Sequence, residues 1–511
     1  MTTTPGRYRP LVPALLLALA PTLALGDEGA TSLALAAPVE AAAPTAGDPL
    51  TLRLASDEEG GGRAPEHPEN RYRLRPPFEE PGFQRYDVPA DKNTPLAVGE
   101  IVGINIGMWF FSYWLGHPFS KISFDTIAQN FNKGWIIDTD PFWVNQLGHP
   151  YEGSLFFNAA RSTGHNFYES VLGSFLGSYI WESFMEVQSP SVNDQITTPG
   201  GGSVFGEVLY RSYRLLLDSA PGKPSFWRRA GALIVDPVAA GNEWLFGDRY
   251  RGPTLLPPSF MLELHLGMVI AGGTRDLETG ASKTQVGPWA SVAAHLTYGV
   301  PGTPGLRLRE PFDHFDFRAD FAFAGQEEPT ASLLIRGTVV GGTVGPATDW
   351  GGLWGLFATY DVIGVPLFKA TGFGLGPGVS LRKQWGWFEL EGTALAELLP
   401  WAGGGSIQKL FARDYHYGPG VCGVLDTRVL FGDRVFADVE FREYFISGAY
   451  ATGSSEDVSW GRLALTGRIA GPHAATVAAD LAYRHASYVA NPTISQRGAV
   501  FQAYYTFLSG W

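Results

Sequence analysis

A strict alternation of charged and apolar residues in the C-terminal half is the feature that most constrains the fold of this chain. In the segment 435–442 one parity carries the charges and the other is apolar. The charged set is Asp438, Glu440 and Arg442, and the apolar set is Val435, Ala437, Val439 and Phe441. Phe436 alone breaks the pattern. Because successive side chains of a strand point to opposite faces, this segment predicts a strand between a polar and an apolar environment.

The same pattern recurs in the segment 477–487. One parity reads Ala478, Asp480, Ala482 and Arg484, and the other reads Val477, Ala479, Leu481 and Tyr483. Turn residues separate about a dozen such runs of roughly ten residues, the length that crosses a bilayer at a tilt. We therefore predict an antiparallel transmembrane β-barrel of about twelve strands over residues 255–511. A soluble β-sandwich is disfavoured, because it would not need so many outward Leu, Tyr and Phe positions.

The last predicted strand, 498–511, carries aromatic residues on one face and ends on one. These residues are Phe501, Tyr505, Phe507 and Trp511. The ending resembles the C-terminal signal by which bacterial outer-membrane barrels are recognised for assembly. It departs in having Trp511 where Phe is usual, and the small Ser509 two residues earlier. The resemblance implies the outer membrane as location, with its lipids and the barrel-assembly machinery as partners.

Composition narrows the class of protein further. The single cysteine, Cys422, forbids an intramolecular disulfide framework. The net charge of -13 argues against nucleic acid as a partner, since phosphate binding needs a basic surface. The abundance of glycine and aromatic residues with few charges fits a lipid-facing sheet. No cofactor and no metal are implied.

The N-terminal 93 residues divide into two predicted segments. Arg7 and Arg9 precede an apolar stretch at 11–25, and Ala24 and Gly26 have the spacing of a signal-peptidase site. We expect residues 1–26 to be a signal peptide. Residues 27–93 are rich in Ala, Pro, Gly and acidic residues without apolar periodicity, which predicts a disordered periplasmic linker.

Residues 94–250 carry helix signals. Asp140-Pro141 and Asp236-Pro237 each combine an N-cap residue with proline at the first helical position. Asn166 and Glu169 form a capping box, and Glu207 and Arg211 have ion-pair spacing on a helix from about 203 to 217. The chain is thus predicted to be an α+β membrane protein, with a helical N-terminal domain before the barrel.

The segment 96–115 is nearly all apolar and long enough to span a membrane. Glu100 and Asn105 count against a free span in lipid, so a buried or interfacial helix is favoured. A barrel with an even number of strands keeps both chain ends on the periplasmic side. We therefore expect the helical domain to be periplasmic or interfacial.

The helical part also has an order of motifs that is typical of a known family. The motifs are Asp140-Pro141-Phe142-Trp143-Val144-Asn145, His149-Pro150-Tyr151-Glu152-Gly153, Ala160-Arg161, Trp181-Glu182 and Glu186. Over about 95–215 they resemble an uncharacterised bacterial envelope family catalogued as domain of unknown function 3943. The resemblance implies an envelope protein without an assigned activity.

The polar residues within these motifs lie among aromatic residues, so we expect them to be buried. They are Asn145, His149, Arg161, Glu182 and Glu186. Buried charges must be paired, which favours a structural network of the Arg161–Glu182 type. A binding or catalytic site is the alternative, since histidine with carboxylates can form a general base or a metal site. The spacing matches no metal motif, and Glu182 and Glu186 lack the histidines of a zinc helix.

A second resemblance lies in the penultimate predicted strand. Tyr483-Arg484-His485-Ala486-Ser487 resembles the Tyr-x-His-x-Ser core of outer-membrane acyl hydrolases, the phospholipase A and lipid A deacylase families. It implies His485 as base and Ser487 as nucleophile, on one face of a strand. The chain departs from the pattern at Tyr488, where those families have Asn. No acid follows to orient the histidine.

Three function classes follow from these patterns. The leading one is an outer-membrane barrel of structural, binding or transport role with a periplasmic helical domain. The alternative is an outer-leaflet lipid acyl hydrolase that uses His485 and Ser487. The third is an envelope enzyme with its site around His149 and Glu182. The missing orienting acid is the reason to favour a role without catalysis.

Overall fold

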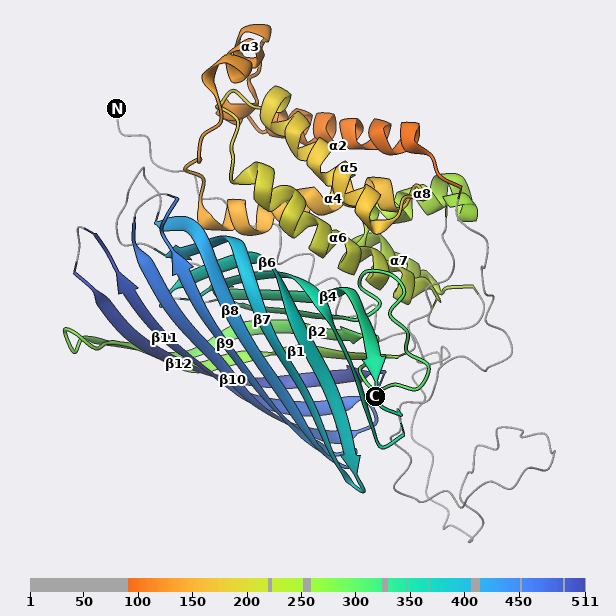
Figure 1. Cartoon of the computed structure of the whole chain (residues 1–511), viewed down its shortest axis with the longest axis vertical. Helices are drawn as coiled ribbons and strands as arrows, with labels where there is room; N and C mark the ends of the chain where they lie inside the picture. Colours follow the sequence, from red (N-terminus) through yellow and green to blue (C-terminus); the bar gives the residue numbers. More distant parts are fainter. Residues whose placement is uncertain are drawn as a thin grey trace, which may run out of the picture.

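The chain folds into a bundle of helices followed by a closed β-barrel, as seen in a computed structural model (Figure 1). The structure describes residues 91–218, 223–250, 259–323, 330–346, 348–365, 367–405, 414–450, 453–489 and 492–510. The predicted signal peptide and all but the last three residues of the predicted linker lie outside these ranges. The helices end at Tyr250 and the strands begin at Phe260, which confirms the predicted fold class.

The barrel has twelve strands, each antiparallel to its neighbours, and β12 closes the sheet by pairing with β1. The number of strands agrees with the prediction. The strands are β1 Phe260–Asp276, β2 Ser282–Tyr298, β3 Phe315–Ala322, β4 Thr330–Val344, β5 Trp350–Gly364, β6 Lys369–Trp385, β7 Phe388–Gly405, β8 Tyr415–Phe431, β9 Val435–Ser447, β10 Ser455–Ala470, β11 His473–Ser487 and β12 Ile494–Ser509.

The two rims of the barrel differ in the length of their connections. At one rim, β4/β5, β6/β7, β8/β9 and β10/β11 are joined by two to five residues, and only β2/β3 has a long connection. We call this the short-turn rim. Strand β1 begins there and β12 ends there, so the chain enters and leaves the barrel at the same rim.

Side-chain direction follows the alternation in the sequence. Asp438, Glu440 and Arg442 of β9 point into the lumen, together with Phe436, the exception in the pattern. The opposite parity points outward, and Leu398, Leu425 and Phe441 are among the outward residues that stay exposed. A charged interior and an apolar exterior are the arrangement of a transmembrane barrel.

Seven helices pack together before the barrel in the described part of the chain. They are α2 Thr94–Trp114, α3 Phe124–Lys133, α4 His149–Arg161, α5 Phe167–Ile180, α6 Asp194–Asp218, α7 Phe226–Val235 and α8 Pro237–Phe246. One turn of π-helix, η3 (Val144–Gly148), precedes α4, and another, η4 (Trp181–Met185), follows α5. The predicted capping box at Asn166 and N-cap at Asp236 are both present.

Helix α6 lies against the outer wall of the barrel, and α4, α5 and α2 follow outward from it (Figure 1). Glycines permit the close approach. A Cβ atom on Gly201 would lie 2.8 Å from the ring of Tyr360 on β5, and one on Gly202 would lie 2.6 Å from the backbone of Gly153 on α4. Helix α6 is therefore held tightly between the sheet and α4.

The part of the wall that the helices cover runs from one rim to the other. Outward residues in register across the strands form a row that runs perpendicular to them. The row is Leu262, Leu296, Phe317, Ile335, Tyr360, Phe373 and Trp401. The row starts at Leu262, close to the first residue of β1 at the short-turn rim. It ends at Trp401, close to the last residue of β7 at the opposite rim. The row belongs, with residues of α6, to one hydrophobic core.

Candidate functional site

The polar residues of the helical domain converge on His149, the first residue of α4. Its Nδ1 atom lies 3.3 Å from Glu152 Oε2 and its Nε2 atom lies 3.6 Å from Asp194 Oδ2. Glu182 belongs to η4 and Glu186 follows it directly. We call His149, Glu152, Glu182, Glu186 and Asp194 the His149 cluster; none of their side chains is exposed.

Each carboxylate of the cluster has a defined position. Glu182 Oε2 accepts a hydrogen bond of 2.7 Å from the backbone N–H of Ser191. Glu186 accepts a hydrogen bond from the indole N–H of Trp181. Asp194, at the start of α6, accepts one of 2.8 Å from Asn193. The π-helical turn η4, the residue that follows it and the first residues of α4 and α6 therefore build this site together.

Burial and mutual repulsion control the protonation of the cluster. Burial raises the pKa of Glu182 well above its ordinary value, and the nearby Glu186 adds to the shift. Burial likewise raises the pKa of Glu186 to about 7. Burial alone would lower the pKa of His149, but the carboxylates of Asp194 and Glu152 outweigh it and raise that pKa well above 6.5. The cluster thus favours a protonated His149 beside Glu182 and Glu186, whose carboxyl groups keep their protons to a higher pH than usual.

Asn145 joins this region to the barrel. Its side-chain N–H groups donate to Asp138 and to the Tyr415 hydroxyl on β8, each at 2.8 Å. Tyr415 in turn donates to the backbone carbonyl of Asp140 at 2.7 Å. Next to it, Gln146 donates to the Tyr417 hydroxyl at 2.7 Å. The motif around Asn145 therefore fixes the domain to the outer face of β8.

The structure does not bring Arg161 to Glu182, and it divides the predicted network into two. Arg161 Nε donates to Glu207 Oε2 of α6 at 2.9 Å, and Arg211 Nε donates to Glu207 Oε1 at 2.8 Å. Arg161 ends α4, whereas the cluster lies at the start of that helix, which explains the separation. The Glu207–Arg211 pair was expected from its spacing, but the role of Glu207 as partner of Arg161 was missed.

The cluster contains the groups for proton exchange or for binding a cationic or hydrogen-bonding ligand. Within the described residues, three metal-ligating side chains come within 4.8 Å of one another only in the barrel. These sets are Glu263, His265 and His295, and Asp361, Glu397 and Cys422. In the first, Glu263 already pairs with Arg428 at 2.5 Å. Neither set could be predicted from sequence patterns, because each combines residues of different strands.

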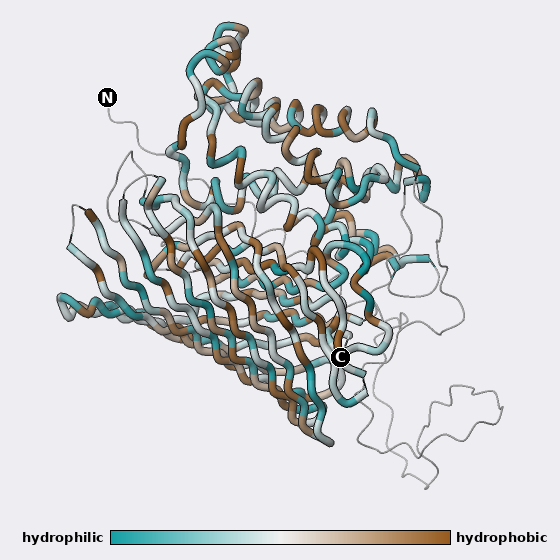
Figure 2. Tube along the Cα trace, in the orientation of Figure 1, coloured by the Kyte–Doolittle hydropathy of each residue, from teal (hydrophilic) through white to brown (hydrophobic). Residues whose placement is uncertain are grey.

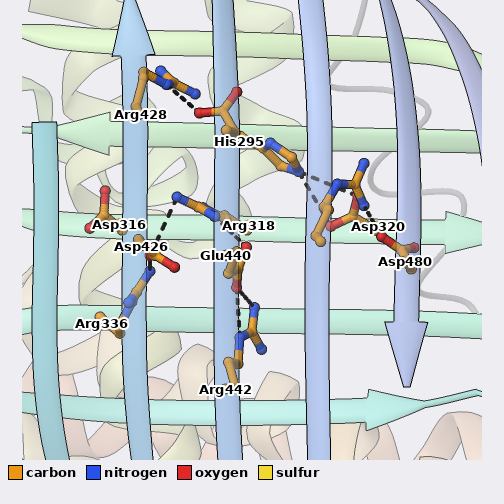
Figure 3. Close-up of polar contacts among 12 residues, drawn as sticks. His295, Asp316, Arg318, Asp320, Arg336, Asp426, Arg428, Glu440, Arg442 and Asp480 are labelled. Carbon is orange, nitrogen blue, oxygen red and sulfur yellow. Dashed lines mark hydrogen bonds and ion pairs between the residues drawn. The ribbon is translucent and has the colours of Figure 1, made fainter. Parts of the chain in front are cut away.

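A network of ion pairs crosses the lumen of the barrel (Figure 3). Arg318 on β3 pairs with Glu440 on β9 and lies 3.5 Å from Asp426 on β8. Arg336 on β4 also pairs with Asp426. Glu440 accepts a second hydrogen bond, of 2.6 Å, from Arg442 Nε. These contacts join strands on opposite sides of the barrel.

Further arginines extend the network along the barrel axis, on either side of Arg318. Arg462 lies 2.9 Å from Asp320, and Arg428 lies 2.5 Å from Asp438. The cavity beside Arg318 measures only about 60 Å³. Its lining includes Glu263, Asp316 and Arg428. Charged side chains from opposite strands therefore narrow the lumen at this level.

The two residues of the acyl-hydrolase motif lie on the outer face of β11, as expected from their parity. His485 Nδ1 is 3.0 Å from the hydroxyl of Ser495 on β12. In the described part of the chain no hydrogen bond links His485 to Ser487, and no carboxylate bonds to the imidazole. The arrangement gives the hydrolase alternative no support.

Several barrels of known structure resemble this chain. The toluene transporter TodX of Pseudomonas putida has 9% identity over 50% of this chain and 90% of its own, with a TM-score of 0.22. The anion-selective porin of Comamonas acidovorans has 9% identity over 48% and 99%, with a TM-score of 0.20. The channel DcaP of Acinetobacter baumannii has 8% identity over 49% and 98%, with a TM-score of 0.22. At such identities their activities do not carry over to this chain.

No curated protein matches the chain. The family model described as Domain of unknown function (DUF3943) matches residues 134–238. These residues include η3, α4, α5, η4, α6 and α7, and thus the whole His149 cluster and the helix that contacts the barrel wall. The match confirms, for this segment, the resemblance that the order of motifs indicated.

Proposed function

We propose that this outer-membrane barrel has a structural or binding role and does not act as an open channel. The observation that carries the proposal is the network around Arg318, Glu440 and Asp426, which joins opposite sides of the lumen. Ion pairs of this kind are costly to break singly, because each leaves an uncompensated charge. Passage of a solute would require the network to rearrange. The candidate binding site of this proposal is the His149 cluster inside the helical domain.

The short-turn rim is proposed to face the periplasm. Short periplasmic turns and longer extracellular loops are the rule for bacterial barrels. The chain leaves the helical domain at Tyr250 and enters β1 at Phe260 on that rim, so the domain would join the barrel from the periplasmic side. A protease added to intact cells is therefore expected to leave the end of the helical domain at Tyr250, which lies beside this rim, uncut. We further propose the barrel-assembly machinery as the partner that inserts the barrel.

Conductance across a planar lipid bilayer tests the closed lumen. The purified protein is expected to show no steady ion current. The double variant Arg318→Ala/Arg336→Ala removes two side chains that cross the lumen and leaves Asp426 and Glu440, so it should admit a cation-selective current. Arg497→Ala, on the outward parity of β12, is the matched control and should stay silent. A steady current through the unaltered protein would refute the proposal.

A further inference from the structure

We propose that the helical domain lies within the bilayer beside the barrel, where the outer faces of α2 and α5 contact lipid acyl chains. The first step of the argument is the position of the domain. The covered row of outward residues runs from Leu262 at the short-turn rim to Trp401 near the opposite rim. The wall between the rims of a transmembrane barrel is where lipid lies. Helices that cover this wall therefore occupy the depth of the membrane.

The second step is the surface that the domain turns away from the barrel. Helix α2 has many exposed apolar side chains, among them Phe110 and Trp114, the latter 71% exposed. Helix α5 exposes Leu172, at 68%, and Phe175. In a water-facing domain this side of a helix carries charges. Figure 2 shows the apolar stretches along these outermost helices.

The third step concerns the few polar groups of α2. Glu100 is its only charged residue, and its carboxylate accepts a hydrogen bond of 2.9 Å from Asn242 of α8. Asn105 is fully buried and donates to the backbone carbonyl of Ile101. Trp109 donates to the carbonyl of Ser120. The side-chain N–H groups of Asn105 and Trp109 and the Glu100 carboxylate thus turn toward the protein and away from lipid, although Asn105 Oδ1 accepts no hydrogen bond from the described residues.

The length of α2 fits the same environment. Its 21 residues extend about 31 Å at 1.5 Å per residue, close to the thickness of the hydrocarbon core. Trp109, Tyr113 and Trp114 gather at one end, as aromatic residues do at the membrane interface. By length and composition, α2 is the one helix of the described chain that could cross a membrane. Only 17% of its apolar stretch is buried inside the protein. Of the two expectations for this segment, a buried or an interfacial helix, the buried helix is therefore wrong.

The exposed face of the helices also continues the exposed apolar face of the barrel. On the parts of β7, β8 and β9 that the helices leave bare, Leu398, Leu425 and Phe441 form the apolar exterior of the barrel. At the middle of the covered row, Tyr360 and Phe317 take outward positions but contact α6 in place of lipid. The helical layer therefore substitutes for lipid on one side of the barrel and presents a new apolar surface to it. This inference does not depend on whether the lumen conducts.

Fluorescence quenching in vesicles tests the proposal. In a Cys422→Ser background, single cysteines are placed at Phe110 and at Leu172 and labelled with an environment-sensitive fluorophore. Leu425→Cys on the bare barrel wall is the lipid-facing control, and Glu278→Cys in the β1/β2 turn is the water-facing control. Each protein is reconstituted into phosphatidylcholine vesicles, and heat-modifiable migration shows which variants have assembled.

Both helix positions are expected to lose fluorescence with doxyl-labelled phosphatidylcholine to the same extent as position 425, and to resist aqueous iodide. Quenching by iodide as at position 278 would place the face in water and overturn the proposal. Protection from both quenchers together with a dimer in cross-linking would assign the face to a second copy of the chain and would equally overturn it. Two positions on separate helices keep the test valid if one variant fails to assemble.

Discussion

Single small residues decide how closely the helical domain approaches the barrel. Gly201 faces the ring of Tyr360, Gly202 faces the backbone of Gly153, and Gly206 faces the ring of Phe157. Helix α6 thus has only glycines, without side chains, at the points where it comes closest to α4 and to the barrel wall. Close approach gains dispersion contacts over the whole length of the contact, so the glycines act through the packing of their neighbours.

Gly202→Ala should weaken the helical domain. The new Cβ atom would lie 2.6 Å from the backbone of Gly153, which cannot move aside without separating α4 from α6. Overpacking of this kind costs about 1–3 kcal/mol. Thermal unfolding in detergent, followed by tryptophan fluorescence, should show a lower midpoint. Gly241→Ala on α8 is the control, because its Cβ would meet nothing within 4 Å. A midpoint unchanged by Gly202→Ala would contradict the close packing of α4 and α6.

Glu186 should make stability depend on pH. Burial raises the pKa of this carboxyl to about 7, from about 4.5 in the unfolded chain. Between these values the unfolded chain releases the proton and the folded chain keeps it, so stability falls as pH rises from 4.5 to 7. Glu186→Gln should flatten this slope of the unfolding midpoint across pH 4.5–7. Glu169→Gln, at a carboxyl on the surface, should leave it in place. Equal slopes in the unaltered protein and in Glu186→Gln would rule out this titration.

Ser487→Ala should leave both assembly and lipid composition unchanged. Ser487 is exposed on the outer face of β11, and His485 bonds to Ser495. Among the described residues no carboxylate bonds to this imidazole, so it lacks the partner that fixes the tautomer of the histidine in a catalytic triad. Mass spectrometry of lipid A and phospholipids from cells with each form is the measurement. An acyl chain lost only when Ser487 is intact would restore the hydrolase.

At the scale of elements, the strands and helices could be predicted because their signals are local. Alternation places Asp438 and Val439 on opposite faces whatever the rest of the chain does, and the capping box at Asn166 starts α5 by its own hydrogen bonds. The docking of α6 could not be predicted. Gly201 and Tyr360 are distant in sequence, and an outward tyrosine looks the same whether lipid or a helix covers it.

The candidate site shows the same division. Of the His149 cluster, His149, Glu182 and Glu186 were predicted as candidates, and Glu152 entered only as part of a motif. Asp194 was missed because its approach to His149 depends on how α4 and α6 pack. Arg161 was assigned to Glu182 and pairs with Glu207 for the same reason. The sequence could therefore show which residues are candidates for the site. Which residues they contact depends on how the helices are arranged.

At the scale of the whole molecule, the barrel is one closed hydrogen-bonded cycle to which the helical domain is fixed on one side. Closure removes the free edges that an open sheet would expose to lipid. The wall that α6 covers includes β4, β5 and β6, and Phe205 of α6 stacks on Phe317 of β3, so the domain has a complete docking surface only once these strands are in register. Barrel closure and domain docking should therefore fail together.

Deleting residues 498–511 tests this coupling. Strand β12 pairs with β11 on one side and with β1 on the other, and the deletion removes most of both ladders. Two edges with unpaired N–H and C=O groups would then face the bilayer, where each unsatisfied group costs several kcal/mol. Heat-modifiable migration in gel electrophoresis should be lost, and the residual chain should be degraded in the periplasm. Arg497→Ala, which alters an outward side chain and keeps every backbone hydrogen bond, should migrate normally. If the truncated chain assembled normally, β12 could not be the strand that closes the barrel.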